Sequence, residues 1–282
     1  MKVVVDSNQL QENALRHFLG ASAQHVAVLT DYASMEAYKG DTLANIYERM
    51  AILSEFPRQV VVLKGTMQAC GMSGRLSGLQ RRLIDAKQTQ GFPRYCEDLR
   101  RAKLGDRPRQ QALVALGLEA SSHLDRMLSD ARGIASAIGD ISKLYSKAER
   151  LSVREGFNCS DEMFDKMVRH IIHVSGCLFG AHPAVRSFPS YAELPNTFLF
   201  RVSLCLYLLA LDWGVRGGVK DVRSERLRND VVDMNFVAFA TYFDGLLTVD
   251  AKAKRIHDEA RLWLQALFRA DVAPARTWSA TT

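Results

Sequence analysis

Short apolar runs alternate with amphipathic stretches over the first third of the chain. Three runs rich in β-branched residues predict buried strands, which lie at residues 3–5, 25–30 and 59–65. The stretches between them place apolar side chains at helical spacing and predict helices at residues 9–20, 31–40 and 42–56. Strands and helices that alternate at these lengths predict an α/β fold, with a parallel sheet flanked by helices.

A different pattern begins after Gly65. Between residues 67 and 225 we find no strand-like alternation, and helices are predicted at about 160–180 and 197–213. A long helix over residues 118–147 has a heptad-like seam, formed by Leu124, Met127, Ala131, Ile134, Ile138, Ile141 and Tyr145. Such a seam packs either against the helix's own domain or against the same helix in a homodimer, and the pattern leaves both interpretations open.

The α/β pattern returns near the C-terminal end. An apolar helix leads into a turn at Asp244-Gly245, a short strand at residues 246–249 and a helix at residues 251–268. We therefore expect an α/β domain in two parts, residues 1–66 and residues 225–272. A large, mostly α-helical insertion, residues 67–224, separates these parts, and residues 273–282 are expected to form a flexible tail.

Composition and charge restrict the class of protein. The 282 residues are 48% hydrophobic and carry a formal net charge of +6, as expected for a globular protein with a basic surface. The five cysteines have wide spacings and no zinc-binding pair, so we expect reduced thiols in a cytoplasmic protein. The N-terminal residues lack the apolar run of a signal peptide, and Arg201 and Asp212 interrupt the most apolar stretch. A membrane partner is therefore not expected.

Basic charge is concentrated in residues 73–110, which we call the basic segment. It contains ten basic and four acidic side chains, so its net charge of +6 equals that of the whole chain. Candidate contacts to nucleic acid are Arg75, Arg81, Arg82, Arg94, Arg100, Arg101 and Lys103. Phe92 and Tyr95 lie among these side chains and could stack on a base. The alternative interpretation is an ordinary solvated face.

Acidic residues lie at or near the ends of the predicted elements. Asp6 follows the first strand, and Asp250 follows the last. Glu36 lies in the second helix, whereas Asp230 and Asp233 lie near the start of the late apolar helix. Because strand C-termini and helix N-termini share one edge of a parallel sheet, we expect these carboxylates to converge there. Converging carboxylates require a cation, and oxygen ligands favour Mg²⁺ or Mn²⁺.

Three sequence blocks, in this order, resemble the PIN-like nuclease domain family. VVVDSNQL is similar to its opening strand, aspartate, hydroxyl residue and asparagine, and YASMEAY is similar to its helix with a glutamate. DMNFVAFATYFDGLLTVD resembles its closing block, where an aspartate heads an alanine-rich helix and Thr-x-Asp ends a strand. The matching residues are Asp6, Ser7, Asn8, Glu36, Asp233, Ala238, Ala240, Gly245, Thr248 and Asp250. Compact members of the family lack an insertion of this length, so the choice of substrate is not carried over.

The resemblance implies a PIN-like fold and hydrolysis of phosphodiester bonds, in RNA more often than in DNA. Asp6, Glu36, Asp233 and Asp250 would be catalytic and would bind one or two Mg²⁺ or Mn²⁺ ions, with water as the nucleophile. The products would carry 5′-phosphate and 3′-hydroxyl groups. Asn8 and Thr248 would orient the metal ligands without binding the metal themselves. Asp230 lies one helical turn from Asp233 and competes with it as a ligand; we favour Asp233 for its spacing to Asp250.

Other functions remain as alternatives. A catalytically silent nucleic-acid-binding or adaptor protein could retain the same fold, and an inhibitory or regulatory protein partner stays open in either case. A phosphatase of the haloacid dehalogenase type also begins with a strand and an aspartate. That chemistry uses a second aspartate two residues later, where this chain has Asn8. His170 and His173 have a spacing that can bind a metal on a helix, although no third ligand is evident in the sequence.

Overall fold

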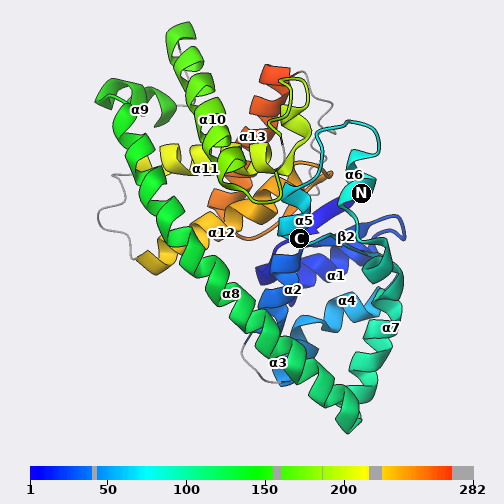
Figure 1. Cartoon of the computed structure of the whole chain (residues 1–282). Helices are drawn as coiled ribbons and strands as arrows, with labels where there is room; N and C mark the ends of the chain where they lie inside the picture. The colour runs from blue at the N-terminus through cyan, green and yellow to red at the C-terminus, as the bar shows by residue number, and fades with distance from the viewer. Residues whose placement is uncertain (40–42, 155–159, 186, 216–223, 269–282) are drawn as a thin grey trace.

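A four-stranded, all-parallel sheet lies at the centre of the fold. The computed structural model describes residues 1–39, 43–154, 160–185, 187–215 and 224–268 (Figure 1). The strands follow the order β3-β2-β1-β4, with bounds β1 (Lys2–Val5), β2 (Val26–Leu29), β3 (Val60–Val62) and β4 (Gly245–Leu247). Helices flank the sheet, and a long, mostly helical region separates β3 from β4 in the chain. The predicted α/β fold with a parallel sheet is therefore confirmed.

The strand side chains divide between two hydrophobic cores. Val4 and Val28 belong to one core, whereas Val3, Val5 and Leu29 belong to the other. This division follows from the two-residue period of a β-strand, which sends successive side chains to opposite faces of the sheet. Because both faces are covered, the central strands consist of continuous apolar residues rather than alternating apolar and polar ones. The fold consequently has three layers.

Helices from the first part of the chain, together with α7, cover the face that carries Val3 and Val5. They are α1 (Asn13–Gly20), α3 (Leu43–Arg49), α4 (Ala51–Glu55) and α7 (Ala86–Lys103). We expected a single helix over residues 42–56. This prediction is wrong, because the structure has two helices there. Met50 adopts φ −92° and ψ 0°, outside regular helical geometry, and divides the helix into α3 and α4.

The second face, with Val4 and Val28, is covered by helices from later in the chain. They are α10 (Asp161–Ala181), α11 (Phe198–Val215), α12 (Ser224–Ala240) and α13 (Ala251–Phe268). α11 is apolar almost all round because α10, α12 and α13 all pack against it. The helices that we assigned to an insertion therefore share one hydrophobic core with the sheet.

The longest helix, α8 (Arg107–Ile141), runs diagonally along the molecule and packs against α2, α7, α11 and α12 (Figure 1). It ends earlier than we expected, so Tyr145 lies beyond a short 3₁₀ turn (Ser142–Leu144). Leu124 and Tyr145 are buried in the chain's own core, and Ile141 packs against it. The other predicted seam positions have side chains outside the described set: Met127, Ala131, Ile134 and Ile138. The homodimer stays a prediction.

Shorter helices complete the described elements that matter here: α5 (Thr66–Cys70), α6 (Leu79–Leu83) and α9 (Lys147–Arg154). Cys70, Cys96 and Cys205 are buried free thiols, as expected, whereas Cys177 is exposed. Cys159 lies outside the described residues. Within the described ranges, none of the helices combines the length and the apolar character that crossing a membrane would need.

Two buried arginines fix the turn between α12 and β4. Arg201 donates to the carbonyl oxygens of Thr241 and Pro195 at 2.7 and 2.6 Å. Arg261 donates to the carbonyl oxygen of Phe243 at 3.0 Å. A buried guanidinium and a buried carbonyl each need a partner, so these bonds compensate both groups. The turn therefore holds the end of α12 and the start of β4 in one defined arrangement.

Candidate active site at the carboxyl edge of the sheet

The strand order creates a crevice between the carboxyl ends of β1 and β4. The chain leaves β1 through a 3₁₀ turn (Ser7–Gln9) towards α1, which covers one face of the sheet. It leaves β4 directly into α13, which covers the other face. Paths that diverge to opposite faces from neighbouring parallel strands leave a crevice at the sheet edge, where α/β proteins commonly bind ligands. Asp6 and Asp250 both follow strands that end there.

Asp6 is the most restrained acid in this crevice. Its amide donates to the carbonyl oxygen of Leu247 at 3.0 Å and continues the β1–β4 pairing by one residue. Asn8 Nδ2 and Thr248 Oγ1 both donate to Asp6 Oδ2 at 2.6 Å. Burial raises the pKa of Asp6, and the hydrogen bond from Thr248 opposes this shift. The two residues expected to support the acids thus orient Asp6 in particular.

Asp233 lies level with this edge although it is far from the end of its helix. It precedes Ala240 by seven residues of α12, about 10 Å of helix. The three residues of β4 return about the same distance in the opposite direction. Our expectation that Asp233 lies near the helix start is wrong, because α12 begins at Ser224. The helix therefore extends beyond Asp233 towards its N-terminus and includes Asp230.

Electrostatic repulsion is strongest at Asp233. Burial raises its pKa to about 8, and the charges of Asp6, Asp230 and Asp250 add to this increase. Lys252 is the cation that opposes the increase. The side chain is half-buried, so solvent reduces the repulsion only in part. A carboxyl group whose ionisation is opposed by three other carboxylates is a favourable position for an added cation.

Asp230, the competing acid, already has two partners. Its Oδ2 accepts a hydrogen bond from Trp213 Nε1 at 3.2 Å, and its Oδ1 pairs with Lys252 Nζ. The carboxylate is buried on α12 between α11 and the start of α13. Each of its oxygens therefore has one described partner within the protein. The choice of Asp233 over Asp230 as the main ligand stays a prediction.

Asp250 closes the site from the β4 side. Its Oδ1 accepts hydrogen bonds from the amides of Lys252 and Ala253, at 2.7 and 3.2 Å, and so caps α13. Its own amide donates to Thr248 Oγ1 at 3.0 Å. A chain of hydrogen bonds thus runs from Asp250 through Thr248 to Asp6. Capping restrains one oxygen of Asp250.

Glu36 lies on α2 (Asp31–Tyr38). This helix begins at the carboxyl end of β2, where the side chain of Thr30 caps it by accepting a hydrogen bond from the amide of Ala33. Tyr32 lies one helical turn before Glu36 on the same helix. Burial raises the pKa of Tyr32, and the charges of Asp233, Glu36 and Asp6 raise it further. Tyr32 therefore lies among acids from three separate elements.

Each of the five predicted acids thus interacts electrostatically with Tyr32, with Asp233 or with both, at one edge of the sheet. Their donors are carboxylate oxygens, the type that Mg²⁺ and Mn²⁺ prefer. As the side chains stand, however, no three His, Cys, Asp or Glu residues in the described ranges are arranged to hold a metal ion. Binding one would require at least one acid to change rotamer. Asp233 and Glu36 are the half-buried candidates for that movement.

Sequence reasoning missed three members of this cluster: Tyr32, Trp213 and Lys252. Lys252 had a local signal, because it follows Asp250 by two residues and therefore lies in the first turn of α13. Tyr32 had a weaker one, its position one helical turn before Glu36. Trp213 had none, because its contact with Asp230 joins two helices through tertiary packing.

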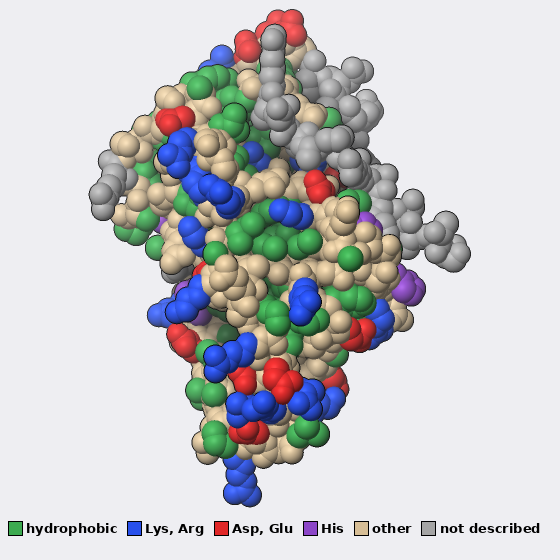
Figure 2. Space-filling model, turned by 90° about the vertical axis from the view of Figure 1, so that its right-hand side faces the viewer, with side chains coloured by type: hydrophobic (Ala, Val, Ile, Leu, Met, Phe, Trp, Pro, Cys, Tyr) green, Lys and Arg blue, Asp and Glu red, His purple; other side chains and the backbone are tan. Residues whose placement is uncertain are grey.

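Several basic side chains of the basic segment already have partners within the protein. Arg100 and Arg101 both pair with Glu97, at 2.8 and 2.9 Å. Arg82 donates to the carbonyl oxygens of Ser73 and Arg75. Among the seven candidate contacts, the other four, Arg75, Arg81, Arg94 and Lys103, are exposed. Figure 2 views the side where α6 and α7 lie in Figure 1, and its lower part shows basic and acidic side chains interspersed.

The aromatic residues of the basic segment do not form a stacking surface. Phe92 is buried in the core beneath α7. Tyr95 packs against the same core, and its hydroxyl contacts the hydroxyl of Tyr38. The interpretation that Phe92 stacks on a base is therefore wrong, because its ring is required to attach α7 to the sheet. Any grip on nucleic acid by this segment would have to be electrostatic.

The histidine pair on α10 has a local structural explanation. His170 Nδ1 lies 2.9 Å from the Tyr145 hydroxyl, and burial lowers the pKa of His170. His173 Nε2 lies 3.9 Å from Cys177 Sγ, one turn further along. The Tyr145 contact connects α10 to the segment that follows α8. These contacts agree with a structural or surface role.

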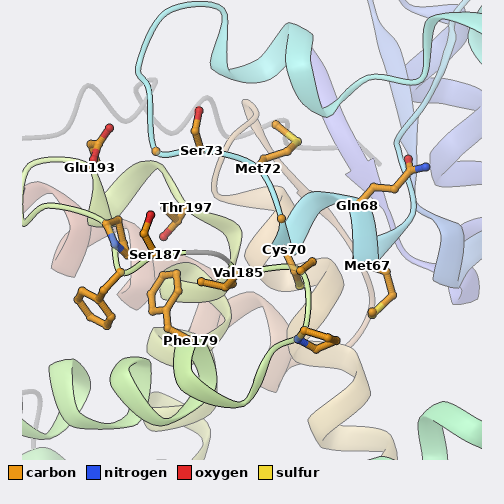
Figure 3. Close-up of a pocket in the computed structure, with 16 residues that line it drawn as sticks. Met67, Gln68, Cys70, Met72, Ser73, Phe179, Val185, Ser187, Glu193 and Thr197 are labelled. Atoms are coloured by element: carbon orange, nitrogen blue, oxygen red, sulfur yellow. The ribbon is translucent and has the colours of Figure 1, made fainter.

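Two hollows lie away from the acids. One, of about 910 Å³, is formed by α5, the end of α10 and the segment before α11 (Figure 3). Figure 3 shows Cys70, Phe179 and Val185 around it. Another, of about 900 Å³, lies between α2, α7 and α8. Neither is lined by Asp6, Glu36, Asp233 or Asp250, so these hollows do not extend the candidate site.

Comparisons with known proteins do not identify a family for this chain. The chain matches no protein family, no curated protein and no solved structure.

Proposed function

We propose that the protein is a metal-dependent nuclease with a PIN-like fold and that RNA is its favoured substrate. The observation that carries this proposal is the convergence of acids at the β1–β4 crevice. Asp6, Asp233 and Asp250 come from separate elements, yet the charges of Asp6 and Asp250 raise the pKa of Asp233. Burying mutually repelling carboxylates is unfavourable for a stable fold and is typical of a functional site.

A bound Mg²⁺ or Mn²⁺ ion would supply Lewis acidity and a nucleophilic water at neutral pH. Asp6, Glu36, Asp233 and Asp250 would hold it through their oxygens. Asn8 and Thr248 would keep the Asp6 carboxylate in one orientation through the bonds that they donate to it. No protein nucleophile is required, and none of the cluster residues is a serine, cysteine or threonine activated by a base.

RNA is favoured over DNA because of the resemblance of the three sequence blocks, and the expected products carry 5′-phosphate and 3′-hydroxyl groups. The net charge of +6 supports a polyanionic substrate. The bound substrate would displace water from a crevice whose floor is the β1–β4 edge.

The proposal is tested by incubating the purified full-length protein with total RNA in the presence of Mn²⁺, and in parallel with EDTA. We expect cleavage only with Mn²⁺, and end-group analysis should find 5′-phosphates. Asp6→Asn is the matched inactive variant, because it keeps the shape of the side chain. Equal cleavage by wild type and Asp6→Asn would indicate a contaminating nuclease and would contradict the proposal.

A catalytically silent nucleic-acid-binding protein is the second candidate. It is favoured by one observation: the described acids are not arranged as a metal site in their present rotamers. In that case RNA binding should be unchanged by Mn²⁺ and by Asp6→Asn, and cleavage should be absent under both conditions. Binding and cleavage measured on the same RNA therefore separate the two candidates.

A further inference from the structure

Lys252 is a cation inside the acidic cluster. Its side chain is 15% exposed, and its ammonium group pairs with Asp230, whose side chain is 9% exposed. The residue lies in the first turn of α13, two positions after Asp250, and its amide donates to the Asp250 carboxylate. Lys252 thus contacts one acid through its side chain and another through its backbone.

The ion pair between Lys252 and Asp230 matters for stability because both charged groups are largely buried. A buried carboxylate without a partner is strongly unfavourable, and a buried ammonium group is equally so. Lys252 and Asp230 compensate each other, and Trp213 occupies the remaining oxygen of Asp230. A metal ion bound to Asp230 would place a second cation against a carboxylate that Lys252 already neutralises. Among the described ion pairs, none involves Asp6, Asp233 or Asp250, and Glu36 pairs with Lys39, whose side chain is 55% exposed.

From these contacts we infer that Lys252 is a positioning residue that holds Asp230 out of the ligand set. The inference rests on the proposed function. It narrows the expected one or two ions to a single Mg²⁺ or Mn²⁺, held by Asp6, Glu36, Asp233 and Asp250. The Lys252 ammonium group already places one positive charge in the cluster, which disfavours a second metal ion beside it.

The decisive comparison uses two aspartates on the same helix. Mn²⁺ binding to the full-length protein would be measured by calorimetry for wild type, Asp230→Asn and Asp233→Asn. We expect one ion per wild-type chain. Asp230→Asn should keep that stoichiometry and an affinity close to wild type, because Asp230 is not a ligand. Asp233→Asn should weaken binding by about tenfold or more.

Removing the lysine tests the same idea from the other side. In Lys252→Met, Asp230 loses its cation, so the metal-free protein should melt at a lower temperature, and Mn²⁺ should restore more of the loss than it adds to wild type. Lys252→Arg should behave like wild type, because it keeps a cation. Lys254→Met, an exposed position in the same turn of α13, is the matched control and should change neither melting nor binding.

The outcomes separate the inference from the proposed function. Two Mn²⁺ ions per wild-type chain, or a tenfold loss of affinity in Asp230→Asn, would overturn the role of Lys252 while leaving a nuclease. No Mn²⁺ binding by wild type would overturn the proposed function itself, and the inference with it. If Lys252→Met does not fold, the Asp230→Asn and Asp233→Asn comparison still decides the question.

Discussion

Asp6 is the residue whose substitution tests the site most directly. It is buried, and its pKa is raised by burial in spite of three side-chain donors from Ser7, Asn8 and Thr248. Asp6→Asn should abolish cleavage, with no detectable residual rate above that with EDTA. Without metal it should be as stable as wild type or more so, because one of the repelling charges is removed. Denaturant unfolding in EDTA measures this, and a clear loss of stability would indicate a structural role instead.

The raised pKa of Asp233 predicts a pH dependence of stability. Its pKa is about 8 in the folded protein and 3.8 in a model peptide, so the folded state retains a proton that the unfolded state loses. Stability of the metal-free protein should therefore fall as pH rises between about 4 and 8. Asp233→Asn lacks this titration and should therefore lose less stability than wild type over that interval. Unfolding measured at several pH values in EDTA checks this, and parallel curves for the two proteins would contradict it.

The core of the candidate site could be predicted from the strand ends together with the resemblance of the three sequence blocks. Asp6, Asn8 and Thr248 each lie within three residues of a strand end, so the parallel sheet brings them to one edge. The partners of Asp230 could not be found in this way. The contact between Trp213 and Asp230 depends on how α11 packs on α12, and local sequence does not encode that packing.

At the scale of elements, the strands and the last helix were the easiest to predict. The expected helix at residues 251–268 has the same bounds as α13, because Asp250 caps it and one apolar face continues through it. The start of α12 was missed by several residues. Its first turns are polar and carry little apolar periodicity, so their helical state depends on packing against α11 and α13.

The turn between α12 and β4 positions two of the predicted acids relative to each other, because Asp233 precedes it and Asp250 follows it. Arg201 is buried and bonds to two backbone carbonyls, so Arg201→Met would leave these acceptors unpaired. We expect a loss of about 3 kcal/mol in stability and weaker Mn²⁺ binding, because the turn sets the spacing between Asp233 and Asp250. Denaturant unfolding and Mn²⁺ titration measure the two effects. Arg94→Met, at an exposed position of α7, is the control; a loss below about 0.5 kcal/mol in Arg201→Met would contradict this role.

At the scale of the molecule, the shared core leads us to expect that residues 67–224 are part of the fold rather than a removable insertion. Val4 and Val28 of the sheet belong to the same core as α10 and α11. Deleting residues 67–224 and joining the two remaining parts by a short Gly-Ser linker would expose that face of the sheet. We expect the shortened protein to lack a cooperative unfolding transition. A cooperative transition in circular dichroism would instead show that the two parts form an independent domain.

The basic segment offers the last test, because its side chains fall into two groups with different expected effects. Arg75, Arg81, Arg94 and Lys103 are exposed, and Arg100 and Arg101 already pair with Glu97. If the segment binds phosphates, changing the first group to Gln should weaken RNA binding and flatten the plot of log affinity against log salt. Each lost contact with single-stranded RNA should reduce that slope by about 0.7.

Arg100→Gln/Arg101→Gln should change the slope less for each charge removed, because Glu97 already offsets part of their charge. Saturating turnover should be unaffected in both variants, since these side chains lie on α6, α7 and their flanking segments and not at the β1–β4 crevice. An unchanged slope in both would make the basic segment a solvated face or a surface for a protein partner. Phosphate binding would then be assigned first to Lys254, which is exposed near the start of α13. Its neighbours Lys252 and Arg255 already pair with Asp230 and Asp212.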